Sequence, residues 1–468
     1  MNRSIFFIGT VFLCLFISCK DDDQTEKTEP EACFDFRSGP YYTGDSIQFT
    51  NCSSNAESYQ WNLNGGLISD KIDFTFTPNN PGEYRVKLSV ENKDEEDTLS
   101  QVFEVEDYNG FVLDKSYPKQ SASPKSIIKM ADGSYLVSYV SFNVFEPSRY
   151  YHLLKINGSF DVEWEWSRRY GANLYGSTLF ENDNGDIQFT QNNWISGFSE
   201  TLVETFTATG QNINSRTITN NENGLIDYMI DGDSIIYVGY SGPRYDYDLF
   251  IHITDHQGSA LDTKLISFDE KVLVGKSIRK NSDGYLLLGW SNIEALSDEK
   301  PKINLLQLDH SLSKSWEMTY NIEGTDADRL NGFDDKWNLI SNEDNSMMIF
   351  AYPTVMKLDQ EGNKIWSKNY RPTEEFLQGL VDGGVIKVGS EFIFGYDNVL
   401  IKIDQEGNEK WRKEIPTGTV VQLLQETDHF VILENRKSYY SSEDIDGELT
   451  AYQVSLIKMD FDGNYLDF

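Results

Sequence analysis

Apolar and polar residues alternate in short runs over the region 32–107, and turn residues separate the runs. Successive side chains of a strand point to opposite faces, so this alternation predicts strands with one buried face. The runs lie at 33–36, 46–50, 59–63, 72–76, 83–90 and 101–105. Several short strands joined by turns predict a small antiparallel β-sandwich over 32–107.

The rest of the chain contains an internal repeat. Its clearest copies are Met356–Trp366 and Ile401–Trp411, each with an Asp, a Gly and a Trp at fixed spacing. The positions equivalent to this Asp are 157, 207, 255, 309, 359, 404 and 460. Turn sequences such as Asp132-Gly133 and Asp283-Gly284 precede each copy, and Asp-Gly between apolar runs indicates a hairpin. Four strands per copy predict an all-β chain with a seven-bladed β-propeller over 110–468.

Closure of a propeller requires its ends to meet. The last copy stops at Phe468, before a full outer strand could form. The pattern of Gly110–Tyr117 predicts a strand that precedes the first copy and does not belong to it. Adding that segment to the last blade would cover edges that otherwise pair with other chains. We therefore expect Gly110–Tyr117 to supply the outer strand of the final blade, with an independent linker as the alternative.

The N-terminus carries an export pattern. Arg3 precedes an apolar run, Ile5–Ser18, which ends at Cys19 and the charged residues Lys20–Asp23. A run of this length with a positive start is typical of a secretory signal peptide, here 1–18, rather than a membrane span, which needs about 20 apolar residues. The polar segment 19–31 lacks periodicity and predicts a solvated tether.

Leu15–Cys19 resembles the lipobox of bacterial lipoproteins, although Phe16 stands where that family usually has leucine. The resemblance implies that Cys19 becomes lipidated and forms the new N-terminus. Lys20–Asp23 resembles the signal that sends lipoproteins of Bacteroidetes-type bacteria to the cell surface. We therefore expect an outer-membrane lipoprotein that is held by palmitate and other acyl chains and faces outward.

The net charge limits the possible binding partners, and the cysteine count predicts one disulfide. The chain has 40 Lys and Arg against 75 Asp and Glu, a formal net charge of −35. Nucleic acid is excluded as a partner, because phosphate binding depends on cationic side chains. After Cys19 only Cys33 and Cys52 remain, and an even pair in an exported domain indicates one disulfide.

Two family resemblances bear on the domains. Thr43–Phe49, Ala56–Trp61 and Pro81–Val86 resemble the PKD (polycystic-kidney-disease-like) domain, an immunoglobulin-like sandwich that acts as a spacer or binding module. The family's acidic loop is replaced by Trp61–Gly66, so no ligand site is expected there, and Trp61 and Tyr84 are expected as core and corner residues. The repeats resemble the tryptophan-containing blades of pyrroloquinoline-quinone-like propellers.

Quinoproteins of that kind hold their cofactor against a vicinal disulfide, whereas the present chain has no cysteine beyond Cys52. We therefore expect no cofactor, and we interpret the repeated Asp and Trp as turn-capping and packing residues. His252 and His256 have weak metal-ligand spacing but are expected in a strand and a turn, so no metal site is predicted. No Ser/His/Asp set or phosphate loop is recognisable.

Loops between the second and third strands of the blades are rich in aromatic residues. Aromatic rings beside carboxylates suit sugars or protein partners. The candidate ligand-binding residues are Tyr150, Tyr151, Tyr245, Tyr247, Tyr439 and Tyr440. Short connections at 351–354 and 395–398 place binding off-centre, against Tyr150, Tyr151, Tyr439 and Tyr440.

We therefore predict a monomeric surface lipoprotein that binds a glycan or an envelope protein as a binding or scaffold module. The alternative is a carbohydrate-active enzyme, a glycosidase or lyase, because paired carboxylates cannot be recognised from sequence alone.

Overall fold

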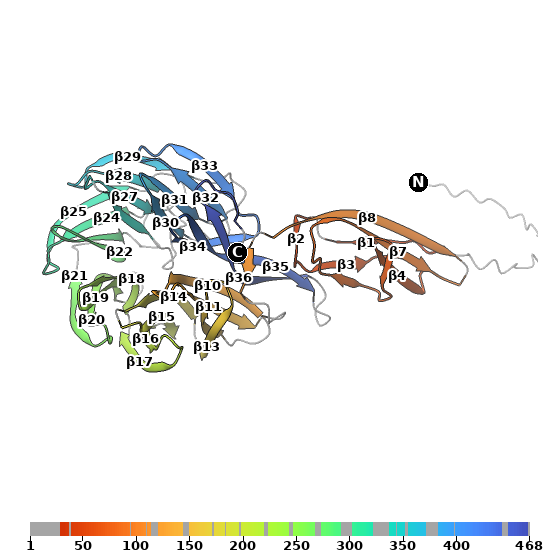
Figure 1. The fold of residues 1–468 in the computed structure, drawn as a ribbon, viewed down its shortest axis with the longest axis horizontal. Coiled ribbons are helices and arrows are strands. Elements are labelled where there is room, and N and C mark those ends of the chain that lie inside the picture. The colour runs from red at the N-terminus through yellow and green to blue at the C-terminus, as the bar shows by residue number, and fades with distance from the viewer. Residues whose placement is uncertain are drawn as a thin grey trace, which may run out of the picture. The chain divides into compact units, whose positions relative to one another are not determined.

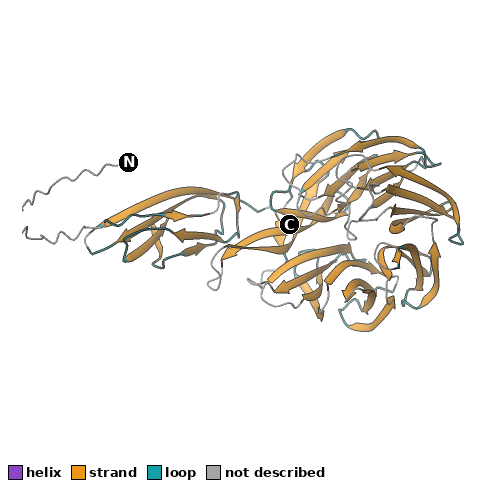
Figure 2. Ribbon diagram, turned by 180° about the vertical axis from the view of Figure 1, so that it is seen from behind, coloured by secondary structure: helices purple, strands orange, loops and turns teal. Residues whose placement is uncertain are grey.

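The computed structural model describes residues 29–466 except 37–38, 94, 109, 114–119, 144–148, 171–172, 183, 196–197, 220–222, 243–246, 267–272, 292–301, 322–336, 343, 352–353, 371–381, 397 and 442–447. The lipidation candidate Cys19 and the predicted signal peptide lie outside these residues. The described part is built from strands and loops, and none of it forms a helix able to cross a membrane (Figure 2). One compact unit ends at Glu106 and another continues from Asp107.

The first unit is a sandwich of two sheets. One sheet has the order β1-β3-β6 and the other β2-β8-β7-β4-β5, with β2 parallel to β8. The strands are β1 (Phe34–Asp35), β2 (Tyr41–Tyr42), β3 (Ile47–Asn51), β4 (Ser58–Leu63), β5 (Gly66–Ser69), β6 (Phe74–Phe76), β7 (Gly82–Glu91) and β8 (Glu96–Glu106). The predicted runs are present, and β2 and β5 are two short additions that the pattern did not show.

Aromatic residues fill the sandwich core. Trp61 is fully buried, and its Nε1 donates to the Lys71 carbonyl at 3.0 Å. The Tyr84 hydroxyl donates to the Asn80 carbonyl, four residues upstream, at 2.8 Å. The expected core and corner roles of Trp61 and Tyr84 are thus confirmed.

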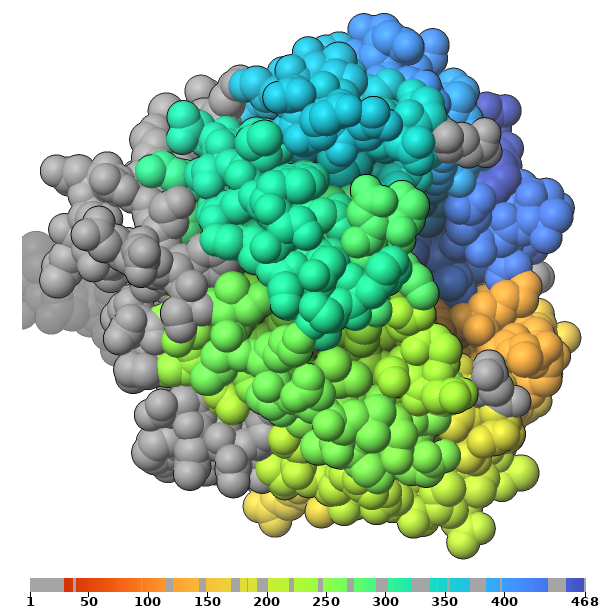
Figure 3. All heavy atoms as spheres, turned by 90° about the vertical axis from the view of Figure 1, so that its left-hand side faces the viewer, coloured from red at the N-terminus to blue at the C-terminus, as the bar shows by residue number. Residues whose placement is uncertain are grey.

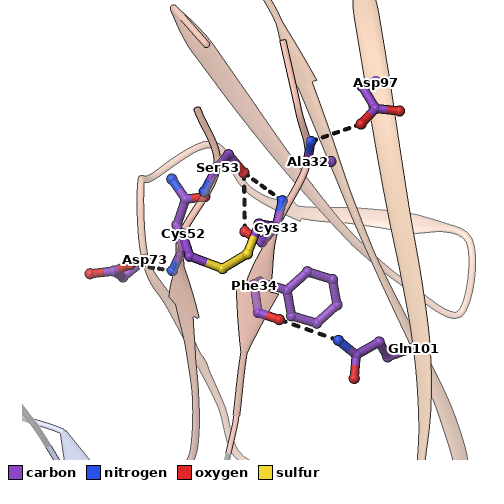
Figure 4. The surroundings of a disulfide bond; sticks show 9 residues. Ala32, Cys33, Phe34, Cys52, Ser53, Asp73, Asp97 and Gln101 are labelled. Atoms are coloured by element: carbon purple, nitrogen blue, oxygen red, sulfur yellow. Dashed lines mark hydrogen bonds between the residues drawn. A yellow bond between two sulfur atoms is a disulfide. The ribbon is translucent and has the colours of Figure 1, made fainter. Parts of the chain in front are cut away.

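The predicted disulfide between Cys33 and Cys52 is also confirmed (Figure 4). It links the start of β1 to the end of β3, whose backbones also pair at this edge because the Cys52 N–H donates to the Cys33 carbonyl at 3.0 Å. Ser53 reinforces the link, because its Oγ donates to the same carbonyl at 3.0 Å and accepts from the Cys33 N–H at 2.9 Å.

The second unit is a β-propeller whose sheets follow one another in chain order (Figure 1). We call the described four-stranded antiparallel sheets blades 1 to 7. Blade 1 is β10 (Gln120–Lys129), β11 (Tyr135–Asn143), β12 (Arg149–Ile156) and β13 (Val162–Tyr170); blade 2 is β14 (Asn173–Glu181), β15 (Ile187–Ile195), β16 (Phe198–Phe206) and β17 (Asn212–Thr219); blade 3 is β18 (Asn223–Asp231), β19 (Ser234–Ser241), β20 (Asp248–Asp255) and β21 (Ala260–Ile266). The prediction of an immunoglobulin-like sandwich followed by a β-propeller is confirmed.

The remaining blades have the same order. Blade 4 is β22 (Leu273–Asn281), β23 (Gly284–Ser291), β24 (Lys302–Leu308) and β25 (Lys314–Asn321); blade 5 is β26 (Asn338–Ser341), β27 (Met347–Ala351), β28 (Thr354–Leu358) and β29 (Lys364–Asn369); blade 6 is β30 (Asp382–Val388), β31 (Glu391–Tyr396), β32 (Val399–Ile403) and β33 (Glu409–Glu414); blade 7 is β34 (Gly418–Gln425), β35 (His429–Ser441), β36 (Glu448–Asp460) and β9 (Gly110–Val112). As expected, a segment that precedes blade 1 supplies the outer strand of blade 7, with Val112 opposite Ser455.

The repeated Asp caps the turn between the third and fourth strands. In blade 5 the Asp359 Oδ1 accepts from the N–H groups of Glu361 and Asn363, and Asp404 of blade 6 repeats the pattern. Gly362 has a φ of 86°, a conformation that L side chains rarely adopt. The interpretation of the Asp as a turn residue is confirmed.

The repeated Trp packs on the turn of the next blade. Trp366 Nε1 donates to the Gln405 carbonyl at 3.1 Å, and a Cβ on Gly407 would come within 2.8 Å of the Trp366 ring. Trp164 has the same relation to Ala208 and Gly210, with an Nε1 to carbonyl distance of 3.1 Å. The Trp therefore joins neighbouring blades, as its interpretation as a packing residue required.

Candidate functional site

A hydrogen-bonded cluster lies on one face of blade 1, and consecutive strands supply its members. His152 on β12 stacks on Tyr139 of β11, with ring centroids 4.3 Å apart and planes inclined by 4°. His152 Nδ1 is 3.1 Å from Glu165 Oε1 on β13, and His152 Nε2 is 2.7 Å from Ser141 Oγ on β11. The Tyr139 hydroxyl donates to the same Glu165 oxygen at 2.9 Å.

The strand register explains this arrangement. Tyr139 lies opposite His152, and Leu154 lies opposite Glu165. Because alternate residues of a strand share a face, Ser141, His152 and Glu165 all project to one side of the sheet.

The order of hydroxyl, imidazole and carboxylate is the order that activates a serine nucleophile in acyl transfer. Ser141, however, is only 1% exposed. A buried hydroxyl cannot reach a substrate carbonyl, so the described geometry does not support hydrolysis at Ser141. We assign Ser141 and His152 a positioning role toward Glu165.

Glu165 is the accessible member of the cluster, because 46% of its side chain is exposed. The hydrogen bond from His152 lowers the pKa of Glu165, and the bond from Tyr139 acts in the same direction against partial burial. The carboxylate is thus held ionised and in a fixed orientation. Tyr150, half-buried at the start of β12, has its ring centroid 6.4 Å from that of His152. An oriented acceptor that shares a sheet face with an aromatic ring can receive hydroxyl donors while the ring covers an apolar face of the same ligand.

The other candidate tyrosines have different positions. Tyr151 is 1% exposed and packs edge-on against Phe189 at 5.6 Å, and Tyr247 is 2% exposed, with its ring 4.9 Å from Tyr240. The prediction that Tyr151 and Tyr247 are exposed loop residues is wrong. Tyr151 lies in a strand and points to the face opposite Tyr150, and Tyr247 lies in the core between blades.

Tyr245 lies outside the described residues. Tyr439 and Tyr440 belong to β35, a strand longer than the sequence indicated, and their side chains are likewise outside the described part. Of the candidate tyrosines, the structure therefore brings Tyr150 to a described polar cluster.

Two carboxylates in the described part of the propeller are fully buried. Glu434 of β35 is fully buried and accepts from the hydroxyls of Tyr108, Thr417 and Ser455. Burial raises the pKa of Glu434. Glu204 of β16 is also fully buried, and burial likewise raises its pKa against the ion pair with Arg168. Because neither carboxylate is accessible, both belong to the framework of the fold.

The sequence did not reveal the Ser141–His152–Glu165 set, because its members are far apart along the chain and meet only through the strand register. Alternation within each strand could have shown a shared face, but not the offset between strands. His252 and His256 lie in β20 and in the following turn, as expected. No group of three or more His, Cys, Asp or Glu residues within the described ranges is placed to hold a metal ion.

Comparison with known protein families finds a match to the first domain. The family model described as "PKD domain" matches residues 35–105. No curated protein matches the chain. A quinonprotein alcohol dehydrogenase-like protein from Bacteroides thetaiotaomicron is 12% identical over 80% of this chain and 93% of its own, with a TM-score of 0.36.

Two further solved structures are similar at the same low level. The extracellular domain of a putative hybrid two component system from B. thetaiotaomicron is 11% identical over 88% of this chain and 56% of its own, with a TM-score of 0.43. A protein of unknown function from Dyadobacter fermentans is 11% identical over 75% of this chain and 98% of its own, with a TM-score of 0.39.

Proposed function

We propose that the protein is a surface-displayed lipoprotein whose propeller binds a glycan or an envelope protein through blade 1, beside Tyr150 and Glu165. The observation that carries the proposal is the ionised, half-exposed Glu165 carboxylate, which His152 and Tyr139 hold in place, with the Tyr150 ring near His152 on the same sheet face. A fixed acceptor loses little entropy when a hydroxyl donor binds.

The chemistry favours sugar hydroxyls over anionic ligands. Glu165 is negative, and the whole chain carries a formal charge of −35, so a polyanion would be repelled. The Tyr150 ring supplies flat apolar area with a polar tip, which matches the alternating faces of a pyranose ring.

A glycan array probed with the full-length protein in detergent tests the binding function, alongside a pull-down from envelope extracts. We expect the double substitution Tyr150→Ala with Glu165→Gln to lower affinity at least tenfold, because it removes both the ring and the charged acceptor. The matched control is Glu361→Gln with Ile365→Ala on blade 5, which changes an exposed turn and an exposed strand residue. Equal binding by the blade 1 variant and the wild type would contradict the site.

The anchor part of the proposal rests on the lipobox-like Leu15–Cys19. Cys19→Ala should abolish labelling with a palmitate analogue and leave the protein either shed or retained as the uncleaved precursor. Cys33→Ala is the control, because Cys33 is already bonded to Cys52 and should not change labelling. Labelling that persists in Cys19→Ala would show that the anchor lies elsewhere.

A further inference from the structure

The joint between blades 2 and 3 is built differently from the other joints of the propeller. On each second strand, the residue paired with the one two positions before the repeated Asp faces the following blade, as the hydrophobic clusters show. In six blades this residue is apolar: Leu136, Ile236, Leu286, Met348, Ile393 and Val431. Blade 2 has the fully buried Gln188 at this position.

The opposite side of the joint shows a matching exception. The residue just before the repeated Asp lies on the third strand and faces the preceding blade. In six blades it is Ile156, Phe206, Leu308, Leu358, Ile403 and Met459, each within a hydrophobic cluster. Blade 3 has the fully buried Thr254 instead. Gln188 and Thr254 thus replace an apolar pair on both sides of one joint.

Several polar atoms buried around this pair lack a hydrogen-bond partner in the described part of the chain. They are the Gln188 Oε1, the hydroxyls of Thr190, Tyr237 and Thr254, and the His252 Nε2. Burial raises the pKa of Tyr237 to about 12, although the nearby hydroxyls of Thr190 and Thr254 act to lower it. These three hydroxyls therefore lie close together across the joint, in contacts that lower the pKa of Tyr237 but fall short of good hydrogen-bond geometry.

Two hydrogen bonds with good geometry cross the joint between described residues. The Tyr228 hydroxyl donates to the Leu179 carbonyl at 2.7 Å, and Gln188 Nε2 donates to the His256 carbonyl. Four other joints have a Trp against the turn glycine, at Gly210, Gly362, Gly407 and Gly463, whereas here Arg216 is the neighbour of the blade 3 turn glycine, Gly258. The yellow-green surface of blade 2 adjoins the green surface of blade 3 in Figure 3.

We infer that the propeller opens first at the joint between blades 2 and 3. Separation of two apolar faces loses burial energy with no compensation. Separation at Gln188 and Thr254 returns the polar atoms without partners to water, which recovers hydrogen bonds and offsets part of the loss. Local openings of this kind occur at the least stable contacts of a native protein.

Thiol labelling of single cysteines measures the opening, because the propeller contains no natural cysteine. Thr254→Cys reports on the joint between blades 2 and 3. Leu358→Cys, at the equivalent position, and Ala351→Cys report on the joint between blades 4 and 5, and all three sites are fully buried. Thr254→Cys and Ala351→Cys change side-chain volume little, so at least one probe of each joint should fold normally.

We expect the full-length protein to be labelled at Thr254→Cys at least ten times faster than at either control under native conditions. Addition of Gln188→Leu should slow labelling at Thr254→Cys severalfold, because it restores the apolar residue of the other joints. Labelling at Thr254→Cys that is no faster than at Ala351→Cys would overturn the inference. An unchanged rate after Gln188→Leu would overturn it as well, because the polar pair would then not be the cause.

Discussion

The joint between blades 4 and 5 and the joint between blades 2 and 3 come from the same repeat but hold together by different means. Between blades 4 and 5, Leu286 and Leu358 belong to one hydrophobic cluster, and Trp316 packs on the turn glycine Gly362. Between blades 2 and 3, Gln188 and Thr254 occupy the equivalent positions. The repeat therefore fixes the shape of a joint, while a few facing residues set its strength.

The Glu165 cluster and the weak joint lie on different contacts of the propeller. The face that carries His152 and Glu165 also carries Tyr139, which packs with residues of blade 7. Polar side chains at that contact are satisfied by one another, whereas those between blades 2 and 3 include several without partners. A polar cluster whose members bond to one another, as around Glu165, fixes the geometry of a site. A polar cluster with unsatisfied members, as around Gln188, weakens the contact that contains it.

The largest effect should follow from making the strong joint resemble the weak one. Leu286→Gln places an amide in the hydrophobic cluster between blades 4 and 5, and we expect a loss of roughly 3–5 kcal/mol in the free energy of unfolding. Urea denaturation of the propeller transition measures the loss. A loss below about 1 kcal/mol would show that joints tolerate polar residues freely.

The unfolding transition of the sandwich is an internal reference, because substitutions at the propeller joints should not change it. Cys33→Ser with Cys52→Ser removes a bridge between residues separated by 19 positions. In the chain-entropy model the loss is about 3 kcal/mol, and it should fall on the sandwich transition alone. Near-ultraviolet circular dichroism and tryptophan fluorescence can follow the two transitions, and a matching shift of the propeller would contradict their independence.

A smaller effect should come from the Trp contact between blades. Trp366→Ala removes a half-buried ring and its hydrogen bond to Gln405, and we expect a loss of about 2 kcal/mol. Arg216→Ala at the joint between blades 2 and 3 should cost less than about 0.5 kcal/mol, because a half-buried cation takes the place of the ring there. Equal losses of unfolding free energy for Trp366→Ala and Arg216→Ala, measured by urea denaturation, would contradict the idea that the Trp contact strengthens a joint.

Much of the propeller could be predicted because its signals are local. Asp359 caps its own turn, and alternation marks the strands, so the repeat was visible in the sequence. The burial of Tyr151 was not predictable, because it depends on where a strand begins and on which neighbour its face meets. Gln188 is visible as an exception among the repeats, but only the packing of blade 2 on blade 3 gives it a consequence.

The smallest expected effect is a pH dependence of the free energy of unfolding that comes from His252 at the joint between blades 2 and 3. Burial lowers the pKa of His252, so the neutral imidazole is the favoured form in the folded protein. Unfolded histidine binds a proton more readily, so this contribution to stability is present above the unfolded pKa of about 6.5 and is lost as pH falls. The stability of the wild type relative to His252→Phe, measured by urea denaturation, should therefore decrease between pH 7 and pH 5; a constant difference would contradict the burial of His252.

The free energy of unfolding of Gln188→Leu with Thr254→Ile tests the central claim most directly. The double substitution gives the joint between blades 2 and 3 the apolar pair found at the six other joints. It also removes two of the buried polar side chains that have oxygens without partners. We predict that urea denaturation will show a stability gain of about 1 kcal/mol, within the range of core optimisation. No change or a decrease would show that the polar pair does not weaken the joint.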